Sequence, residues 1–184
     1  DNGPPFATVG LGGLSRLASW WIKLGITPER IEPGKPHQNG VHERMHRTLK
    51  ADAINPPART LRTQQRVFDR FRQEYNYERP HEALGQRPPG EVYEPSPRRY
   101  VGCVEELVYP ETMEVRRVKG NGEISWRNRK VFLSEVLAGE RIGLEEMENG
   151  EWGIYLGDFY LGKLDSIGGR VIRAEGLRKG RSLR

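Results

Sequence analysis

The chain has 184 residues and a formal net charge of +5, a length that suits one compact domain or two small ones. Cys103 is its one cysteine, which excludes an internal disulfide and a thiolate zinc site. No apolar run reaches the roughly 20 residues of a membrane-spanning helix and no export signal opens the chain, so a cytoplasmic protein is expected.

Charge is distributed unevenly along the chain. Residues 1–100 hold 16 Lys and Arg against 11 Asp and Glu, whereas residues 101–184 hold 14 of each. All the excess positive charge therefore lies in the first half. This suits a polyanionic partner, although a role in solubility alone is an equally good explanation.

The first elements are predicted from apolar spacing and from glycine and proline. Leu14, Leu17, Trp21 and Leu24 have helical spacing, which predicts a helix over 11–24 that ends at Gly25. A short edge-like strand is expected over 26–32, followed by a flexible loop over 33–38. Trp20, Trp21 and Phe68 are expected in the core rather than as platforms for base stacking.

Two more helices and a proline-rich arm complete the first half. The second helix is predicted over 39–53, with Asn39 as its cap, and the third over 61–75. Five prolines among residues 77–99 exclude a continuous helix there and predict an extended arm and linker.

The second half changes to short β-like runs separated by turns, which favours a small antiparallel barrel or curled sheet. Hairpin signals are the glycine-rich segments 119–122 and 148–150, and a turn is expected at 156–158. The strands are predicted over 101–109, 112–118, 124–126, 130–133, 141–147, 152–156, 159–164 and 170–173.

One face of the second predicted helix gathers polar groups. With 100° per residue, Arg47 and Lys50 fall within about 40° of Glu43, and His46 falls about 60° away. An exposed Glu43–Arg47 ion pair is the simplest explanation of this pattern. His42 and His46 have a spacing known among zinc ligands, but the sequence offers them no further Cys or His partner.

Four ordered sequence blocks resemble the DDE transposases and retroviral-type integrases, in particular the insertion-sequence transposases. Asp1 and Glu43, with 41 residues between them, match the last two acids of that family. The family's first acid normally lies on a strand upstream of the Asp-Asn-Gly motif. The matching blocks are residues 1–6, 33–40, 42–50 and 75–89.

The resemblance implies a chemistry and a set of site residues. Asp1 and Glu43 would be catalytic residues and ligands of Mg²⁺ or Mn²⁺, two ions in the complete site, because hard cations prefer carboxylate oxygens. The block at 79–84 is assigned a structural role, with His81 hydrogen-bonding near the active face. The implied DNA-binding residues are Lys35, Asn39, His46, Arg47 and Lys50.

The resemblance also implies the architecture. Residues 1–85 would be the C-terminal part of an α/β, RNase H-like core, mostly helical here, and 86–100 a proline-rich linker. Residues 101–175 would form a small all-β barrel, SH3-like, and 176–184 a basic tail. The expected partners are transposon-end and target DNA and further copies of the chain, with no membrane, in a bacterial, nucleoid-associated setting.

The expected function is DNA transposition through metal-dependent 3′-end cleavage and strand transfer. Since the family's first acid is absent from the sequence, the 184-residue chain is expected to bind DNA weakly without cleaving it. Two alternatives stay open: a non-catalytic DNA-binding or assembly module from a truncated element, and an unrelated hydrolase that uses Asp1 and Glu43 as acid and base.

Overall fold

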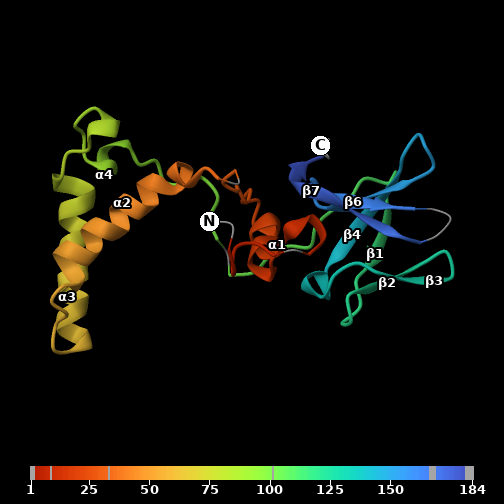
Figure 1. Ribbon diagram of the computed structural model, residues 1–184, viewed down its shortest axis with the longest axis horizontal. Coiled ribbons are helices and arrows are strands. Elements are labelled where there is room, and N and C mark those ends of the chain that lie inside the picture. Colours follow the sequence, from red (N-terminus) through yellow and green to blue (C-terminus); the bar gives the residue numbers. More distant parts are fainter. Residues whose placement is uncertain (1–2, 9, 33, 101, 166–168, 181–184) are drawn as a thin grey trace. The chain divides into compact units, whose positions relative to one another are not determined.

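The computed structural model describes residues 3–8, 10–32, 34–100, 102–165 and 169–180 (Figure 1). The chain divides into two compact units. The β unit combines Asp1–Arg30 with Val101–Arg184, and the helical unit is Ile31–Tyr100. The segment before residue 31, predicted as part of the core domain, thus belongs to the same unit as the strands.

The β unit is built on a five-stranded antiparallel sheet in the order β1-β4-β5-β6-β7, with a separate β2–β3 hairpin. Along β4 and β5 the side chains of Ile142, Leu144, Ile154 and Leu156 are fully buried, as alternate positions on one face of a half-covered sheet must be. The strands are β1 Glu114–Arg117, β2 Glu123–Trp126, β3 Arg129–Phe132, β4 Arg141–Glu146, β5 Trp152–Leu156, β6 Phe159–Leu164 and β7 Val171–Lys179.

The sheet stays open, so the closed barrel expected from the sequence is not found in the described part of the chain. The edge strand β1 pairs with β4, and the other edge strand β7 pairs with β6. The strand predicted over 101–109 was also wrong, because residues 104–109 are irregular. This segment is held by the Tyr109 hydroxyl, which donates to the Arg141 carbonyl at 2.7 Å, instead of by a ladder.

The turns were partly predicted. Asn149-Gly150 joins β4 to β5 and Gly157-Asp158 joins β5 to β6, as expected. The turn at 119–122 also forms, but it joins β1 to β2, which lie in different sheets. The hairpin partner of β2 is β3, through a turn at Arg127 and Asn128 with φ of 44° and 61°.

The N-terminal segment of the β unit is broken where one helix was predicted. Gly12 and Gly13 have positive φ, so the short 3-10 helix Leu11–Gly13 ends there and α1 begins only at Arg16–Lys23. The Ser15 hydroxyl caps α1 by accepting from the Ala18 N–H at 3.0 Å.

Apolar residues of this segment enter the core of the β unit. Leu11, Leu14, Ala18 and Ile22 belong to one buried cluster with the side chains of the sheet. Trp20, expected in the core, is 40% exposed, which corrects that prediction. Trp21 is half-buried and stacks on Phe6 at 5.9 Å, and the strand predicted over 26–32 is irregular backbone interrupted by Pro28.

The helical unit has little core of its own. Its helix α2 spans Gly40–Leu49 and continues as a π-helix over Lys50–Ile54, and α3 spans Leu61–Gln73 and continues as a π-helix over Glu74–Glu78. Neither α2 nor α3 contains a buried residue, and Phe68 is only half-buried. Shorter helical elements are Pro36–Asn39, Glu82–Leu84 and α4 Pro89–Val92.

Local sequence explains where these helices begin. Thr60 and Thr63 form a reciprocal capping box at the start of α3. Asn39 precedes α2 as predicted, but its side chain makes no capping hydrogen bond. Pro89, at the first position of α4, suits a helix start because its ring fixes φ there.

Candidate nucleic-acid and metal-binding face

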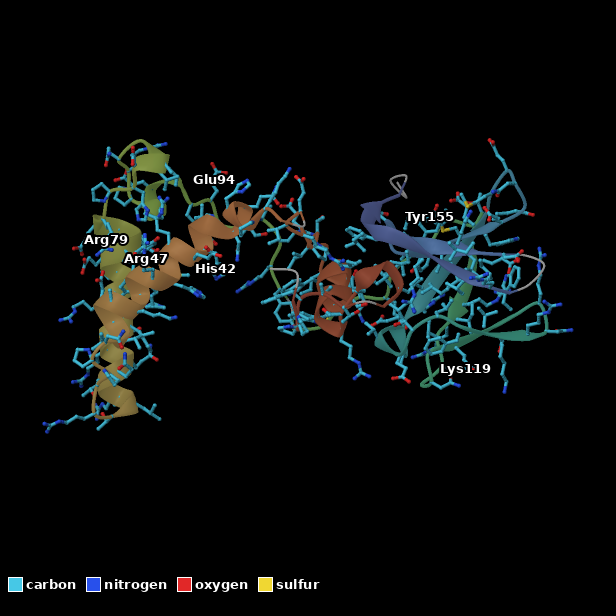
Figure 2. All side chains as sticks on the ribbon, viewed as in Figure 1. His42, Arg47, Arg79, Glu94, Lys119 and Tyr155 are labelled. Atoms are coloured by element: carbon cyan, nitrogen blue, oxygen red, sulfur yellow. The ribbon has the colours of Figure 1, made fainter. Side chains whose placement is uncertain are left out.

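Helix α2 presents Glu43, Arg47 and Lys50 to solvent along one side. All three side chains are exposed, and among the described residues none of them forms a salt bridge. The Glu43–Arg47 ion pair that would explain this spacing as an ordinary surface feature is therefore not formed. The face leaves one carboxylate and two cations free to meet a ligand, and Figure 2 labels Arg47 on it.

His46, the fourth polar residue of this face, contacts a second histidine. Its Nε2 lies 2.9 Å from Nε2 of His42, one turn earlier, and the two rings meet edge to face at 4.4 Å. One imidazole donates and the other accepts, in an order set by their tautomers, so a hydrogen bond joins the two exposed rings. His46 is therefore oriented by His42.

Lys35 and Asn39 lie before α2 in different situations. The Lys35 ammonium forms an ion pair with Glu32, whose carboxylate also accepts from Gln38 at 3.0 Å. Both hydrogen bonds lower the pKa of Glu32, and the one from Lys35 is the larger cause. The positive charge of Lys35 is thus already compensated, while Asn39 is half-exposed next to the free end of α2.

The predicted pair of catalytic carboxylates has no defined geometry. Asp1 lies outside the described residues, whereas Glu43 lies in the helical unit. Over the described ranges no three His, Cys, Asp or Glu side chains gather closely enough to hold a metal ion. A two-ion site needs more than the one exposed carboxylate of Glu43, so these residues alone do not fit it.

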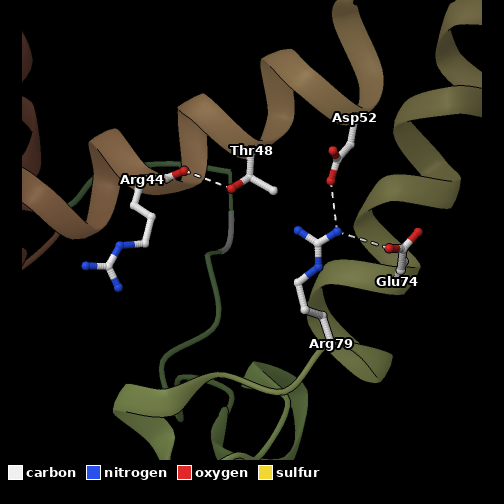
Figure 3. A network of polar contacts seen from close by, with 5 residues as sticks. All are labelled: Arg44, Thr48, Asp52, Glu74 and Arg79. Atoms are coloured by element: carbon white, nitrogen blue, oxygen red, sulfur yellow. Dashed lines mark hydrogen bonds and ion pairs between the residues drawn. The ribbon is translucent and has the colours of Figure 1, made fainter.

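Arg79 organises the helical unit behind this face (Figure 3). Its guanidinium donates to Asp52 at 2.8 Å and to Glu74 at 3.1 Å, and it lies 5.9 Å from the centre of the Tyr75 ring. The hydrogen bond that Arg79 donates to Asp52 is the largest cause of the raised pKa of Arg79. Arg79 therefore joins the π-helical ends of α2 and α3.

His81, from the same sequence block, packs edge to face on Tyr75 at 4.7 Å. Its Nε2 is buried without a hydrogen-bond partner in the described structure, and its backbone N–H donates to the Arg87 carbonyl at 3.3 Å. The expected side-chain hydrogen bond is thus not formed, and the ring acts as a packing group. The sequence could not reveal the Arg79 contacts, because Asp52 lies 27 residues away.

Two segments of the chain match protein-family models. Residues 24–89 match the family model described as integrase core domain, and residues 113–168 match that of the IS481 family transposase C-terminal domain. The first match contains Glu43, Arg47, Lys50 and Arg79. Among the described residues, no helix is both long and apolar enough to cross a membrane.

Two curated relatives come from insertion elements. The chain is 33% identical over 92 residues to the insertion element IS407 uncharacterized 31.7 kDa protein of Burkholderia multivorans (strain ATCC 17616 / 249). It is also 33% identical over 92 residues to the insertion element IS476 uncharacterized 39.2 kDa protein of Xanthomonas euvesicatoria. These matches cover 50% of this chain but 31% and 25% of the relatives.

The two family matches indicate the class of protein that the chain resembles: part of an integrase core followed by a transposase C-terminal domain. The chain thus has one segment similar to the integrase core domain and a later segment similar to the C-terminal domain of IS481 family transposases. The resemblance seen in the four sequence blocks is confirmed.

Proposed function

We propose that this chain acts in DNA transposition, as part of a transposase that cleaves the 3′ ends of its element and joins them to target DNA. The observation that carries the proposal is the exposed, unpaired set of Glu43, Arg47 and Lys50 on α2, inside the integrase core match. The RNase H-like character of this segment and the SH3-like character of the β unit belong to the same proposal.

Arg47 and Lys50 contact DNA phosphates in this proposal. They lie one and two turns after Glu43, so phosphates bound there would sit beside its carboxylate. A guanidinium can donate two parallel hydrogen bonds to one phosphate, whereas an ammonium acts as a point charge, which favours Arg47 as the main contact. His46 and Asn39 flank this pair, whereas Lys35 would have to leave Glu32 to join it.

Glu43 is proposed as a ligand of a divalent metal ion, together with Asp1. Integrase core domains use divalent metal ions. When bound, such an ion would activate the hydroxyl or water that attacks phosphorus. Because the described residues contain one suitable carboxylate on this face, Asp1 and any further ligands must come from outside the helical unit's described face. The chain's own contribution is then to hold one carboxylate and two phosphate-binding cations at fixed spacing.

The substitution Glu43→Gln in a protein carrying a complete core tests the catalytic part. It keeps the size and shape of the side chain but removes the negative charge and replaces one acceptor oxygen by an amide donor. Nicking and strand transfer with Mg²⁺ or Mn²⁺ should be abolished while DNA affinity is kept. Normal strand transfer by this variant would reject the role of Glu43.

A non-catalytic DNA-binding or assembly module is the second candidate. It is favoured by the lack of a three-acid cluster among the described residues, and it requires only the cations of α2. The two candidates differ in whether Glu43 matters for anything beyond DNA affinity, which the same Glu43→Gln variant measures.

A further inference from the structure

The tip of the β2–β3 hairpin gathers positive charge in a part of the chain that is otherwise balanced. Residues 101–184 hold 14 basic and 14 acidic residues, yet Arg127, Arg129 and Lys130 follow one another within four positions at this tip. All three side chains are exposed. Among the described residues, neither Arg127 nor Lys130 forms a salt bridge.

Arg127 is held in place by two buried tryptophans. Its guanidinium carbon lies 4.7 Å from the ring centre of Trp126 and 5.2 Å from that of Trp152, both within the range of a cation–π contact. The indoles meet edge to face at 5.8 Å and are only 2% and 6% exposed, so the core fixes them. The guanidinium is therefore oriented before any ligand arrives.

The backbone at this turn places an arginine in a conformation that seldom suits one. Arg127 and Asn128 both have positive φ, the conformation of a hairpin turn that favours Asn, Asp and Gly. Asn128 suits it, but an arginine at its first position is unfavourable. A strained residue persists where its surroundings hold it, and such residues gather at functional sites.

A fourth cation lies near the base of the same hairpin. The Lys119 ammonium, labelled in Figure 2, donates to the Ser125 hydroxyl at 2.9 Å. Ser125 is directly opposite Lys130 in the β2–β3 ladder, so both lysines lie on its outer face. Positive charge thus continues from the tip along one side of the hairpin.

We propose that the β2–β3 tip binds the phosphate backbone of duplex DNA, with Arg127 and Lys130 as the contacting side chains. A two-stranded ribbon fits the major groove, about 12 Å wide, and a guanidinium pairs with phosphate in a fixed, two-pronged geometry. Trp126 and Trp152 are buried and therefore cannot stack on bases. The contact would recognise the phosphate charges of DNA rather than its base sequence. This inference rests on the proposed function, because it takes DNA as the substrate. The residues that it uses lie far from α2 in the sequence.

The test compares the salt dependence of DNA binding by the full chain and its variants. The probe is a short labelled duplex of mixed sequence. Replacing both contacts, Arg127→Gln with Lys130→Gln, should reduce the slope of log K against log salt by about 1.8, since each phosphate contact contributes roughly 0.9. Lys130→Gln alone touches neither tryptophan and should reduce it by about 0.9.

A control with the same change in charge uses Arg16→Gln with Arg117→Gln, two exposed arginines of the β unit outside the hairpin. This control should keep the wild-type slope. An equal loss in the control would mean that affinity follows the unit's net charge, and this result would overturn the proposal. So would an unchanged slope in the tip variants, or a loss of protein association in place of DNA affinity.

The same variants separate this proposal from the role of α2. In a background that carries Arg47→Ala and Lys50→Ala, the tip substitutions should still lower the slope by the same amount. If α2 bound no DNA, the background alone would have no effect while the tip variants kept theirs.

Discussion

The Arg79 guanidinium lies 2.8 Å from the Asp52 carboxylate, although 27 residues separate the two in sequence. Glu74 accepts a second hydrogen bond from the same nitrogen at 3.1 Å. This bridge ties together two π-helical segments in a unit where Ala53 is the one buried hydrophobic residue among those described. Polar contacts therefore carry an unusual share of the stability of the helical unit.

Loss of this bridge should weaken the helical unit. Arg79→Gln should lower its free energy of unfolding by about 1 kcal/mol, because partly exposed ion pairs contribute modestly. A double-mutant cycle with Asp52→Asn, measured by urea denaturation, should give a coupling of about 0.5 kcal/mol or more. Purely additive effects of the two substitutions would mean that the bridge does not contribute.

The N-terminal segment should be needed for the stability of the strands. Leu14 is 1% exposed within the same core as Ile124 and Ile154, so Leu14→Ala should lower the stability of the β unit by about 3 kcal/mol. Leu61→Ala, at a leucine that is 91% exposed in the helical unit, is the matched control and should change little. Thermal unfolding followed by circular dichroism, which reports on helices and strands alike, measures both.

Proteolysis should separate the sequence halves without separating the β unit. Residues 93–100 are all exposed and without helix or strand, so cleavage is expected there, between Gly85 and Arg99 as the prolines predict. Because Leu11, Leu14 and Ile22 are buried among the strands, the two fragments should elute together from a sizing column. Cleavage concentrated within residues 114–164 would contradict this division.

Stability should fall at alkaline pH because of Tyr109. Burial raises its pKa to about 12, against about 10 in the unfolded chain. Between these values the unfolded chain has lost the proton that the folded chain keeps, so rising pH favours unfolding by up to about 1.4 kcal/mol per pH unit. Below about pH 10 both states are protonated and this contribution to stability is fully present.

The variant Tyr109→Phe isolates this effect. It should be less stable at neutral pH, because the hydroxyl's bonds to the Arg141 carbonyl and from the Gly157 N–H are lost. Its stability should then fall less steeply above about pH 10. Burial also raises the pKa of Tyr160, so a smaller slope should remain, and urea denaturation across this range measures the difference.

The elements that the sequence predicted well are those whose pattern is local. The apolar alternation of β4 and β5 and the glycine turns between β4, β5 and β6 identified these strands to within a residue or two. The helices α2 and α3 were likewise evident from their spacing. In both cases the residues that determine the element lie inside it.

What the sequence could not predict depended on distant partners. Leu14 and Ile22 have the spacing of any amphipathic helix, which does not tell which surface they cover. The turn at Arg127 carries no glycine, so the β2–β3 hairpin was not recognised. The side chains of Glu43, Arg47 and Lys50 are exposed along one side of α2, and their role as a site stays a prediction. The Lys35–Glu32 ion pair was not predicted, because it depends on how the loop before α2 folds.

The salt dependence of DNA binding tests the central claim most directly. Arg47→Ala with Lys50→Ala should weaken binding equally for all sequences and reduce the slope of log K against log salt by about 1.8. The control removes two exposed arginines one turn apart on α3, Arg62→Ala with Arg66→Ala, and should leave the slope unchanged. An unchanged slope in the α2 variant, or an equal reduction in both, would contradict the assignment of α2 as the DNA-binding face.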